Sequence, residues 1–204
     1  MKVLLIDYQM GNLGSVRRAI EECGADVLCS TDPHDIKAVS RIILPGVGSF
    51  REGMQHLSKS GWIREIREAA IEDGIPFLGI CLGMQLLSSK GWEGGETEGL
   101  GLIPGTVKKL VSHSPETRIP HVGWNELIIS QQNPLLFGIP DRSDFYFVHS
   151  YHFATDDPGN IIATTPYCGE FVSVVACNNI FGTQFHPEKS SKAGFRLIQN
   201  FLSF

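Results

Sequence analysis

The sequence predicts an α/β fold, with a central, mixed and mostly parallel β-sheet flanked by helices. Apolar runs of strand length alternate with segments of helical periodicity up to residue 87, which is the order of a right-handed β-α-β arrangement. The first run, residues 3–7, is continuously apolar up to its final aspartate, as in a strand buried on both faces. After residue 87, strand-like runs follow one another, so the second half of the sheet is expected to be partly antiparallel.

The first half of the chain is expected to alternate strands with helices. Asn12 is placed to cap a helix whose apolar residues recur at helical spacing until Gly24 ends it. Pro33 opens a brief second helix, and Gly74 ends an amphipathic third one. Strands are expected at residues 3–7, 26–29, 41–44 and 76–80, and the third helix at 62–73.

The second half is expected to hold shorter strands and one final helix. A glycine-rich segment, residues 91–105, predicts a loop. Strands are expected at residues 107–110, 127–129, 145–148, 161–164, 172–176 and 180–185, and a helix at 192–202. No repeat, low-complexity tract or interdomain linker is visible in the sequence, so residues 1–204 are expected to form one domain.

Composition excludes several classes of function. The 204 residues are 42% hydrophobic and 19% charged, and the formal net charge of −5 comes without runs of lysine or arginine, which argues against nucleic-acid binding. No apolar run approaches membrane-spanning length, and no signal peptide is expected before the first strand. The five cysteines lack C-x-x-C spacing, which favours a reducing cytoplasm over a disulfide framework or a zinc site.

Cys81 is the first candidate for chemistry. It lies in the pentapeptide Gly-Ile-Cys-Leu-Gly, residues 79–83, between an apolar strand and a helical stretch, which is the pattern of a nucleophile elbow. The glycines permit a tight turn that a Cβ would block, and the N-terminus of the helix favours a thiolate. The pentapeptide suits a buried structural cysteine equally well, so alone it leaves both interpretations open.

A histidine and a carboxylate near the C-terminus favour the nucleophile. The apolar run 180–185 leads directly into His186, Pro187 and Glu188, and Pro187 is expected to stop the strand at His186. Histidine is the usual base for a cysteine nucleophile, and a carboxylate orients it. His-Pro-Glu alone also suits a surface turn, but together with the elbow it predicts a Cys81–His186–Glu188 triad at the strand ends.

Two more segments are candidates for a role in the site. Pro-Gly-Val-Gly, residues 45–48, follows a strand and would present backbone N–H groups to an oxyanion if that strand lies beside the elbow. On these four residues alone, an ordinary strand-ending turn is favoured. His149 and His152 have a spacing that suits a metal ion, but no third ligand lies nearby in the sequence, so no metal site is expected.

In their order and spacing, residues 45–48, 79–85 and 186–188 resemble the class I glutamine amidotransferases, whose fold is flavodoxin-like. The resemblance covers essentially the whole chain. Four features further resemble the glutaminase subunits that serve histidine biosynthesis, namely residues 6–12 (Ile-Asp-Tyr-Gln-Met-Gly-Asn), 120–125 (Pro-His-Val-Gly-Trp-Asn), 146–151 (Tyr-Phe-Val-His-Ser-Tyr) and Lys189. Residues 92–98 and 112–118 are less recognisable.

The resemblance implies a glutaminase that uses no metal or other cofactor. Cys81 would attack the side-chain amide of glutamine, His186 would relay the proton to the departing ammonia, and Glu188 would hold His186. Water would then hydrolyse the γ-glutamyl thioester to glutamate. The Val47 N–H, once its peptide turns inward, would join the Leu82 N–H in the oxyanion hole. Five residues are expected to hold the glutamine: Gly48, Gln85, Ser150, Tyr151 and, as a further candidate, Glu93.

The resemblance also implies a partner. Ammonia in water at neutral pH is mostly ammonium, which is not a nucleophile, so a glutaminase that serves a synthesis needs a docked acceptor. The glutaminases that the chain resembles form a heterodimer with a (β/α)8-barrel cyclase subunit, whose occupancy controls glutamine hydrolysis. Five residues are candidates to face this partner, although each equally suits a local fold contact: Tyr8, Asn12, Trp124, Asn125 and Lys189.

Other functions on the same fold were considered. A paralogous glutaminase would feed a different synthase, for example one that aminates a surface sugar, and the catalytic residues do not separate these two cases. A peptidase with a related elbow fits His-Pro-Glu less well. A non-catalytic subunit that keeps the fold is disfavoured by the intact Cys81, His186 and Glu188.

Overall fold

The computed structural model of the chain describes residues 1–112, 114 and 117–204. Its first half contains β1 (Lys2–Ile6), α1 (Leu13–Glu22), β2 (Asp26–Ser30), the 3₁₀-helix η1 (Pro33–Ala38), β3 (Arg41–Leu44), α2 (Phe50–Lys59), α3 (Trp62–Arg67), the π-helix η2 (Glu68–Glu72), β4 (Phe77–Ile80) and α4 (Leu82–Leu86). The alternation of strands and helices that the sequence predicts is therefore present.

The second half is rich in short strands, as expected. It contains β5 (Lys90–Gly91), β6 (Thr97–Glu98), β7 (Gly105–Lys109), β8 (His121–Glu126), β9 (Ile128–Ile129), the 3₁₀-helix η3 (Pro134–Leu136), β10 (Asp144–His149), β11 (Tyr151–Thr155), the 3₁₀-helix η4 (Pro158–Asn160), β12 (Ile161–Thr165), β13 (Phe171–Cys177), β14 (Ile180–Thr183), the 3₁₀-helix η5 (Pro187–Lys189) and α5 (Ser191–Ser203).

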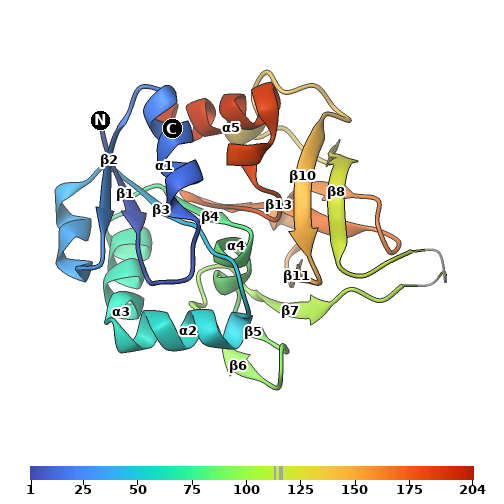
Figure 1. The fold of residues 1–204 in the computed structure, drawn as a ribbon, viewed down its shortest axis with the longest axis horizontal. Helices are drawn as coiled ribbons and strands as arrows, with labels where there is room; N and C mark the ends of the chain where they lie inside the picture. Colours follow the sequence, from blue (N-terminus) through green and yellow to red (C-terminus); the bar gives the residue numbers. More distant parts are fainter. Residues whose placement is uncertain (113, 115–116) are drawn as a thin grey trace.

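The main sheet has eight strands in the order β2-β1-β3-β4-β14-β13-β12-β9. The strands from β2 to β14 pair in parallel, whereas the pairings from β14 to β9 are antiparallel. Two smaller sheets, β10-β8 and β11-β7-β5-β6, lie beside its antiparallel half (Figure 1). The fold class predicted from the sequence is confirmed.

Helices cover both faces of the sheet, with α1 and α5 on one face and α2 and α3 on the other (Figure 1). Strand β1 shows why its sequence is continuously apolar. Val3 and Leu5 pack into a core with α1 and α5, whereas Leu4 and Ile6 pack into a second core with α2, α3 and α4. All four side chains are fully buried. Within the described residues, no helix is both long and apolar enough to cross a bilayer.

Several elements differ from the sequence prediction. Helix α2 was not expected, although Ser49 and Glu52 form the capping box that begins it: the Ser49 hydroxyl accepts from the Glu52 N–H at 3.3 Å. Strands β8 and β11 were missed, and β5 and β6 form a short hairpin inside the segment expected to be a loop. Asn12 occupies the N-cap of α1, but its side chain makes no capping hydrogen bond.

Candidate active site

Cys81 lies at a sharp turn between β4 and α4. Its backbone has φ 56° and ψ −109°, a conformation that residues other than glycine rarely adopt. A Cβ on Gly79 would lie 2.6 Å from the Gly83 oxygen, and a Cβ on Gly83 would overlap the carbonyl oxygen of Leu44. Both flanking glycines are therefore required by close backbone packing, as expected for a nucleophile elbow.

The surroundings of the sulfur are polar and almost closed. Cys81 is 6% exposed, and its N–H donates to the Thr183 oxygen at 2.7 Å, which ties the elbow to β14. The thiol lies 4.0 Å from the Val148 carbonyl oxygen as a donor. The side-chain amide nitrogen of Gln184 lies 3.7 Å from the sulfur as a donor.

His186 follows β14 and is fixed from several directions. Its N–H donates to the Tyr146 oxygen at 3.0 Å, and its carbonyl oxygen accepts from the Ser190 hydroxyl at 2.6 Å. Its Nδ1 lies 2.8 Å from a carboxylate oxygen of Glu188, and both side chains are buried. A carboxylate at this nitrogen keeps the proton there, so Nε2 is the nitrogen that exchanges protons with another group.

In the part of the chain that the structure describes, the second nitrogen of the His186 ring has no hydrogen-bond partner. Nε2 is buried and has no partner at hydrogen-bonding distance among the described residues. Burial by itself lowers the pKa of His186, but interactions with the side chains of Cys81 and Glu188 outweigh burial and raise this pKa to about 10. A pKa raised in this way favours the protonated imidazole at neutral pH.

A pocket of about 300 Å³ opens onto Cys81. It is lined by every residue expected to hold the glutamine or its oxyanion, together with three that were not expected: Val47, Gly48, Leu82, Gln85, Glu93, Ser150 and Tyr151, and then Pro120, Val148 and His149. Segments that lie far apart in the chain therefore converge on one cavity. Glu93 also accepts from the Phe50 N–H at 2.7 Å, so it holds the start of α2 as well as the pocket wall.

The two expected oxyanion donors are engaged elsewhere. The Val47 N–H donates to the Met10 oxygen at 2.6 Å, and the Leu82 N–H donates to the Gly46 oxygen at 3.3 Å. The Gly46 carbonyl and the Val47 N–H belong to the same peptide group. Rotation of that single peptide would release Leu82 and Val47 together.

The residues expected to face a partner do not share one environment. Asn12, Trp124 and Lys189 are exposed, and both Trp124 and Lys189 lie against the Tyr146 ring, with ring centroids 6.2 Å apart and the ammonium 5.8 Å from the centroid. Asn125 is half-buried and donates to the Pro166 oxygen at 3.3 Å, which is a local contact.

The prediction that Tyr8 faces a partner is wrong. It is 2% exposed, and its hydroxyl lies where a Cβ on Gly46 would overlap it. The hydroxyl has no hydrogen-bond partner among the described residues, and burial raises the pKa of Tyr8 well above its usual range. The 45–48 segment folds over this ring, which the sequence of either segment alone does not indicate.

A pair of buried histidines borders the pocket. His121 Nδ1 lies 3.1 Å from His149 Nε2, and His149 Nδ1 lies 2.8 Å from the Tyr151 oxygen. Burial lowers the pKa of His121 to about 4 and that of His149 to about 3, so both rings are neutral at physiological pH. His149 therefore pairs with His121 and supports the pocket wall instead of joining His152 at a metal.

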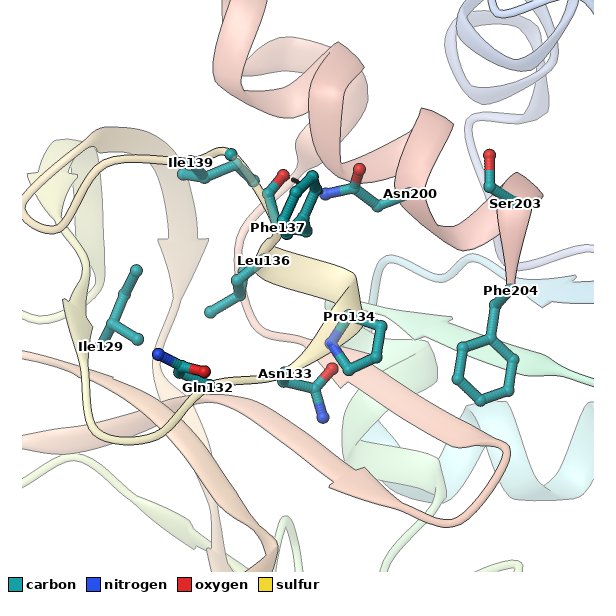
Figure 2. Close-up of a pocket in the computed structure, with 11 residues that line it drawn as sticks. Ile129, Gln132, Asn133, Pro134, Leu136, Phe137, Ile139, Asn200, Ser203 and Phe204 are labelled. Carbon is teal, nitrogen blue, oxygen red and sulfur yellow. Dashed lines mark hydrogen bonds between the residues drawn. The ribbon is translucent and has the colours of Figure 1, made fainter.

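A larger cavity of about 760 Å³ lies away from this site, between η3 and the end of α5 (Figure 2). Its wall includes Pro134, Phe137 and Phe204, and Asn200 donates to the Phe137 oxygen at 2.8 Å. The described residues that line it include no cysteine, histidine, aspartate or glutamate. The cavity therefore lacks a thiol, imidazole or carboxylate among these residues, in contrast to the pocket at Cys81.

Comparison with known proteins identifies the class. The family model "Glutamine amidotransferase class-I" matches residues 4–203, and the chain belongs to this family. The structure of PurLQS from Thermotoga maritima superposes with a TM-score of 0.77 at 20% identity, covering 99% of this chain and 97% of that one, so it shares the fold.

Closer sequence relatives have a more specific name. "Imidazole glycerol phosphate synthase subunit HisH" of Natronomonas pharaonis is 46% identical over 210 residues, covering 100% of this chain and 94% of the relative. "Imidazole glycerol phosphate synthase subunit HisH 1" of Campylobacter jejuni (strain RM1221) is 46% identical over 200 residues, covering 98% of each chain.

Proposed function

We propose that this chain is the glutaminase subunit of an imidazole glycerol phosphate synthase. It hydrolyses glutamine to glutamate and passes the ammonia to a (β/α)8-barrel cyclase subunit, which makes imidazole glycerol phosphate and aminoimidazole carboxamide ribonucleotide in histidine biosynthesis. The observation that carries the proposal is the pocket that opens onto Cys81, together with the buried His186–Glu188 pair whose histidine interacts with this cysteine. The names of relatives that are 46% identical over nearly their whole length support the choice of synthase.

The proposed chemistry uses Cys81, His186 and Glu188. The Cys81 thiolate attacks the side-chain carbonyl carbon of glutamine, and the imidazolium of His186 protonates the nitrogen as the carbon–nitrogen bond breaks. Ammonia leaves, and a γ-glutamyl thioester remains. His186, now neutral, takes a proton from water, which attacks the thioester and releases glutamate and the thiolate. Glu188 stabilises the imidazolium at Nδ1 throughout.

Charge that develops on the amide oxygen needs donors, and the Gly46–Val47 peptide controls them. With this peptide turned as it is here, neither Leu82 nor Val47 is free to donate. We propose that its rotation completes the oxyanion hole and that docking of the loaded cyclase drives this rotation. A donor of this kind typically contributes about 3–4 kcal/mol to lowering the barrier.

The exposed Trp124 and Lys189, which share the Tyr146 ring, and the exposed Asn12 are proposed to meet the cyclase. The heterodimer keeps ammonia away from solvent. A cytoplasmic location is proposed as well, because all five cysteines are free in the structure and Cys81 must stay reduced. No observation favours the alternative that the chain feeds a different synthase.

The complex of this chain with its cyclase tests the proposal through Cys81→Ala. This variant loses the nucleophile but leaves the cyclase intact, so glutamine-dependent synthesis should be abolished while ammonia-dependent synthesis stays at the wild-type rate. Both rates are measured from the formation of imidazole glycerol phosphate. Glutamine-dependent turnover that survives in Cys81→Ala would refute the assigned nucleophile, and a wild-type chain that fails to support synthesis with this cyclase would refute the assigned partner.

A further inference from the structure

Gln184 lies directly behind the nucleophile, and the reaction described above does not use it. It follows β14, is fully buried, and has its N–H bonded to the Ser173 oxygen at 2.9 Å. Its side-chain amide nitrogen lies 3.7 Å from the Cys81 sulfur. Gln184 is fully buried and Cys81 is only 6% exposed, so solvent screens a polar contact here much less than at the surface.

The orientation of the Gln184 amide follows from its neighbours. The Nε2 atom of Gln85 lies 2.9 Å from the Tyr151 carbonyl oxygen and 2.9 Å from one end of the Gln184 amide. A carbonyl oxygen only accepts, so the Gln85 atom must be the NH₂ group, and the Gln184 atom that faces it must be the oxygen. The opposite end of Gln184, which faces the sulfur, is therefore its NH₂ group.

This arrangement affects which form of the sulfur is stable. A donor stabilises the thiolate, whereas an acceptor stabilises the thiol. Val148 offers the acceptor, at 4.0 Å, and Gln184 offers the donor, at 3.7 Å. Of these two hydrogen-bonding groups at the sulfur, Gln184 is therefore the one that favours the reactive thiolate.

We propose that Gln184 is a further catalytic residue, which donates from Nε2 to the Cys81 thiolate and is held in that orientation by Gln85. This proposal rests on the glutaminase function and assigns one more group to the same site. Gln85 also lines the pocket, so the amide of Gln184 links the pocket wall to the nucleophile. A substrate glutamine that moved the Gln85 side chain would therefore change the orientation of the Gln184 amide at the sulfur.

Two variants test the proposal in the complex with the cyclase. Gln184→Met keeps the approximate volume but removes the donor and the acceptor. Gln184→Glu keeps an acceptor for Gln85 but turns a carboxylate toward the sulfur. Ser173→Ala is the matched control, because it removes a neighbouring buried hydroxyl that bonds to Thr165 and does not touch the sulfur.

The measurement is the rate at which iodoacetamide alkylates Cys81 at pH 7, followed by mass spectrometry of the peptide that contains it. Loss of a hydrogen bond to an anion predicts a decrease of about ten- to a hundredfold in Gln184→Met, with recovery at high pH. Gln184→Glu should react still more slowly, and Ser173→Ala should stay within twofold of wild type. The kcat for glutamine hydrolysis should fall in parallel, while co-elution of the two subunits in gel filtration stays unchanged and reports that the complex is intact.

An alkylation rate within twofold of wild type in both Gln184 variants overturns the proposal, whatever happens to glutamine hydrolysis, because the residue would then have only a structural role. If Gln184→Met no longer co-elutes with the cyclase and so fails to assemble, Gln184→Glu decides. Failure of the glutaminase function itself would be seen separately, as glutamine-dependent synthesis that persists in Cys81→Ala.

Discussion

Cys81 keeps a backbone conformation that few non-glycine residues adopt, at a cost of about 1–3 kcal/mol. The surrounding structure holds it there: its N–H is bonded to Thr183, and Gly79 and Gly83 leave room for the neighbouring backbone. The turn puts the sulfur at the wall of the pocket, where it meets Gln184. The strained backbone of Cys81 therefore fixes the position of its sulfur at the pocket wall.

The charge on His186 predicts a pH-dependent contribution to stability. The pKa of an unfolded histidine is about 6.5, whereas Cys81 and Glu188 raise that of folded His186 to about 10. The folded state therefore holds this proton more tightly, and the resulting stability is complete below about pH 6.5 and is lost as the pH rises through about 10. The difference in unfolding free energy between wild type and His186→Gln, from urea titrations at pH 6, 8 and 10, should shrink in that order.

Glutamine hydrolysis by the same variant provides an independent check on the role of His186. His186→Gln should also lower glutamine hydrolysis by several orders of magnitude, because a glutamine side chain cannot take up or deliver the proton. A stability difference that grows from pH 6 to pH 10 would show that His186 is not charged. A loss of hydrolysis below about tenfold would show that it is not the base.

At the scale of elements, the segment between β3 and α2 connects the pocket to the rest of the chain. In its Gly46–Val47 peptide, the carbonyl oxygen accepts from the Leu82 N–H, and the N–H donates to the Met10 oxygen. The helix that follows is anchored by Glu93, which also lines the pocket. A small rotation in this segment therefore alters the oxyanion site without any change in the main sheet.

Val47→Pro tests this segment, because proline has no N–H to donate. In the complex, kcat for glutamine hydrolysis should fall by about 10²–10³-fold, as expected when one oxyanion donor is lost. Val47→Ala keeps the N–H and is the control, expected to stay within a few-fold of wild type. Both are measured by glutamate release with the cyclase and its nucleotide present. Equal rates in the two variants would show that the Val47 N–H does not take part.

At the scale of the whole molecule, the parallel half of the sheet assembles the site. Neighbouring strands β3, β4 and β14 lead respectively into the 45–48 segment, Cys81 and the segment that carries Gln184 and His186. The carboxyl ends of parallel strands meet at one edge, so three distant segments come together there. The two smaller sheets contribute another part of the pocket wall, through Val148 on β10, Tyr151 on β11 and Ser150 between these strands.

Features written locally in the sequence could be predicted. The elbow around Cys81 depends on glycines at fixed positions and appears where expected. The last strand begins at Ile180 as expected but ends at Thr183, earlier than the stop at His186 predicted from Pro187. Features that depend on packing could not. Tyr8 is buried because residues 45–48 fold over it, and Gln184 faces the sulfur because Gln85 orients it from another element. The pattern Ser49-x-x-Glu52 is a local signal for the start of α2, although the sequence prediction did not include this helix.

The central claim is that a sulfur at residue 81, activated by His186, attacks glutamine in the pocket beside it. The most direct measurement is trapping by a glutamine-analogue electrophile in the complex with the cyclase, with the modified residue located by mass spectrometry. We predict one adduct on Cys81, formed quickly in wild type and slowly in His186→Gln. An adduct on any of the other four cysteines, or equal rates in the two proteins, would contradict the account.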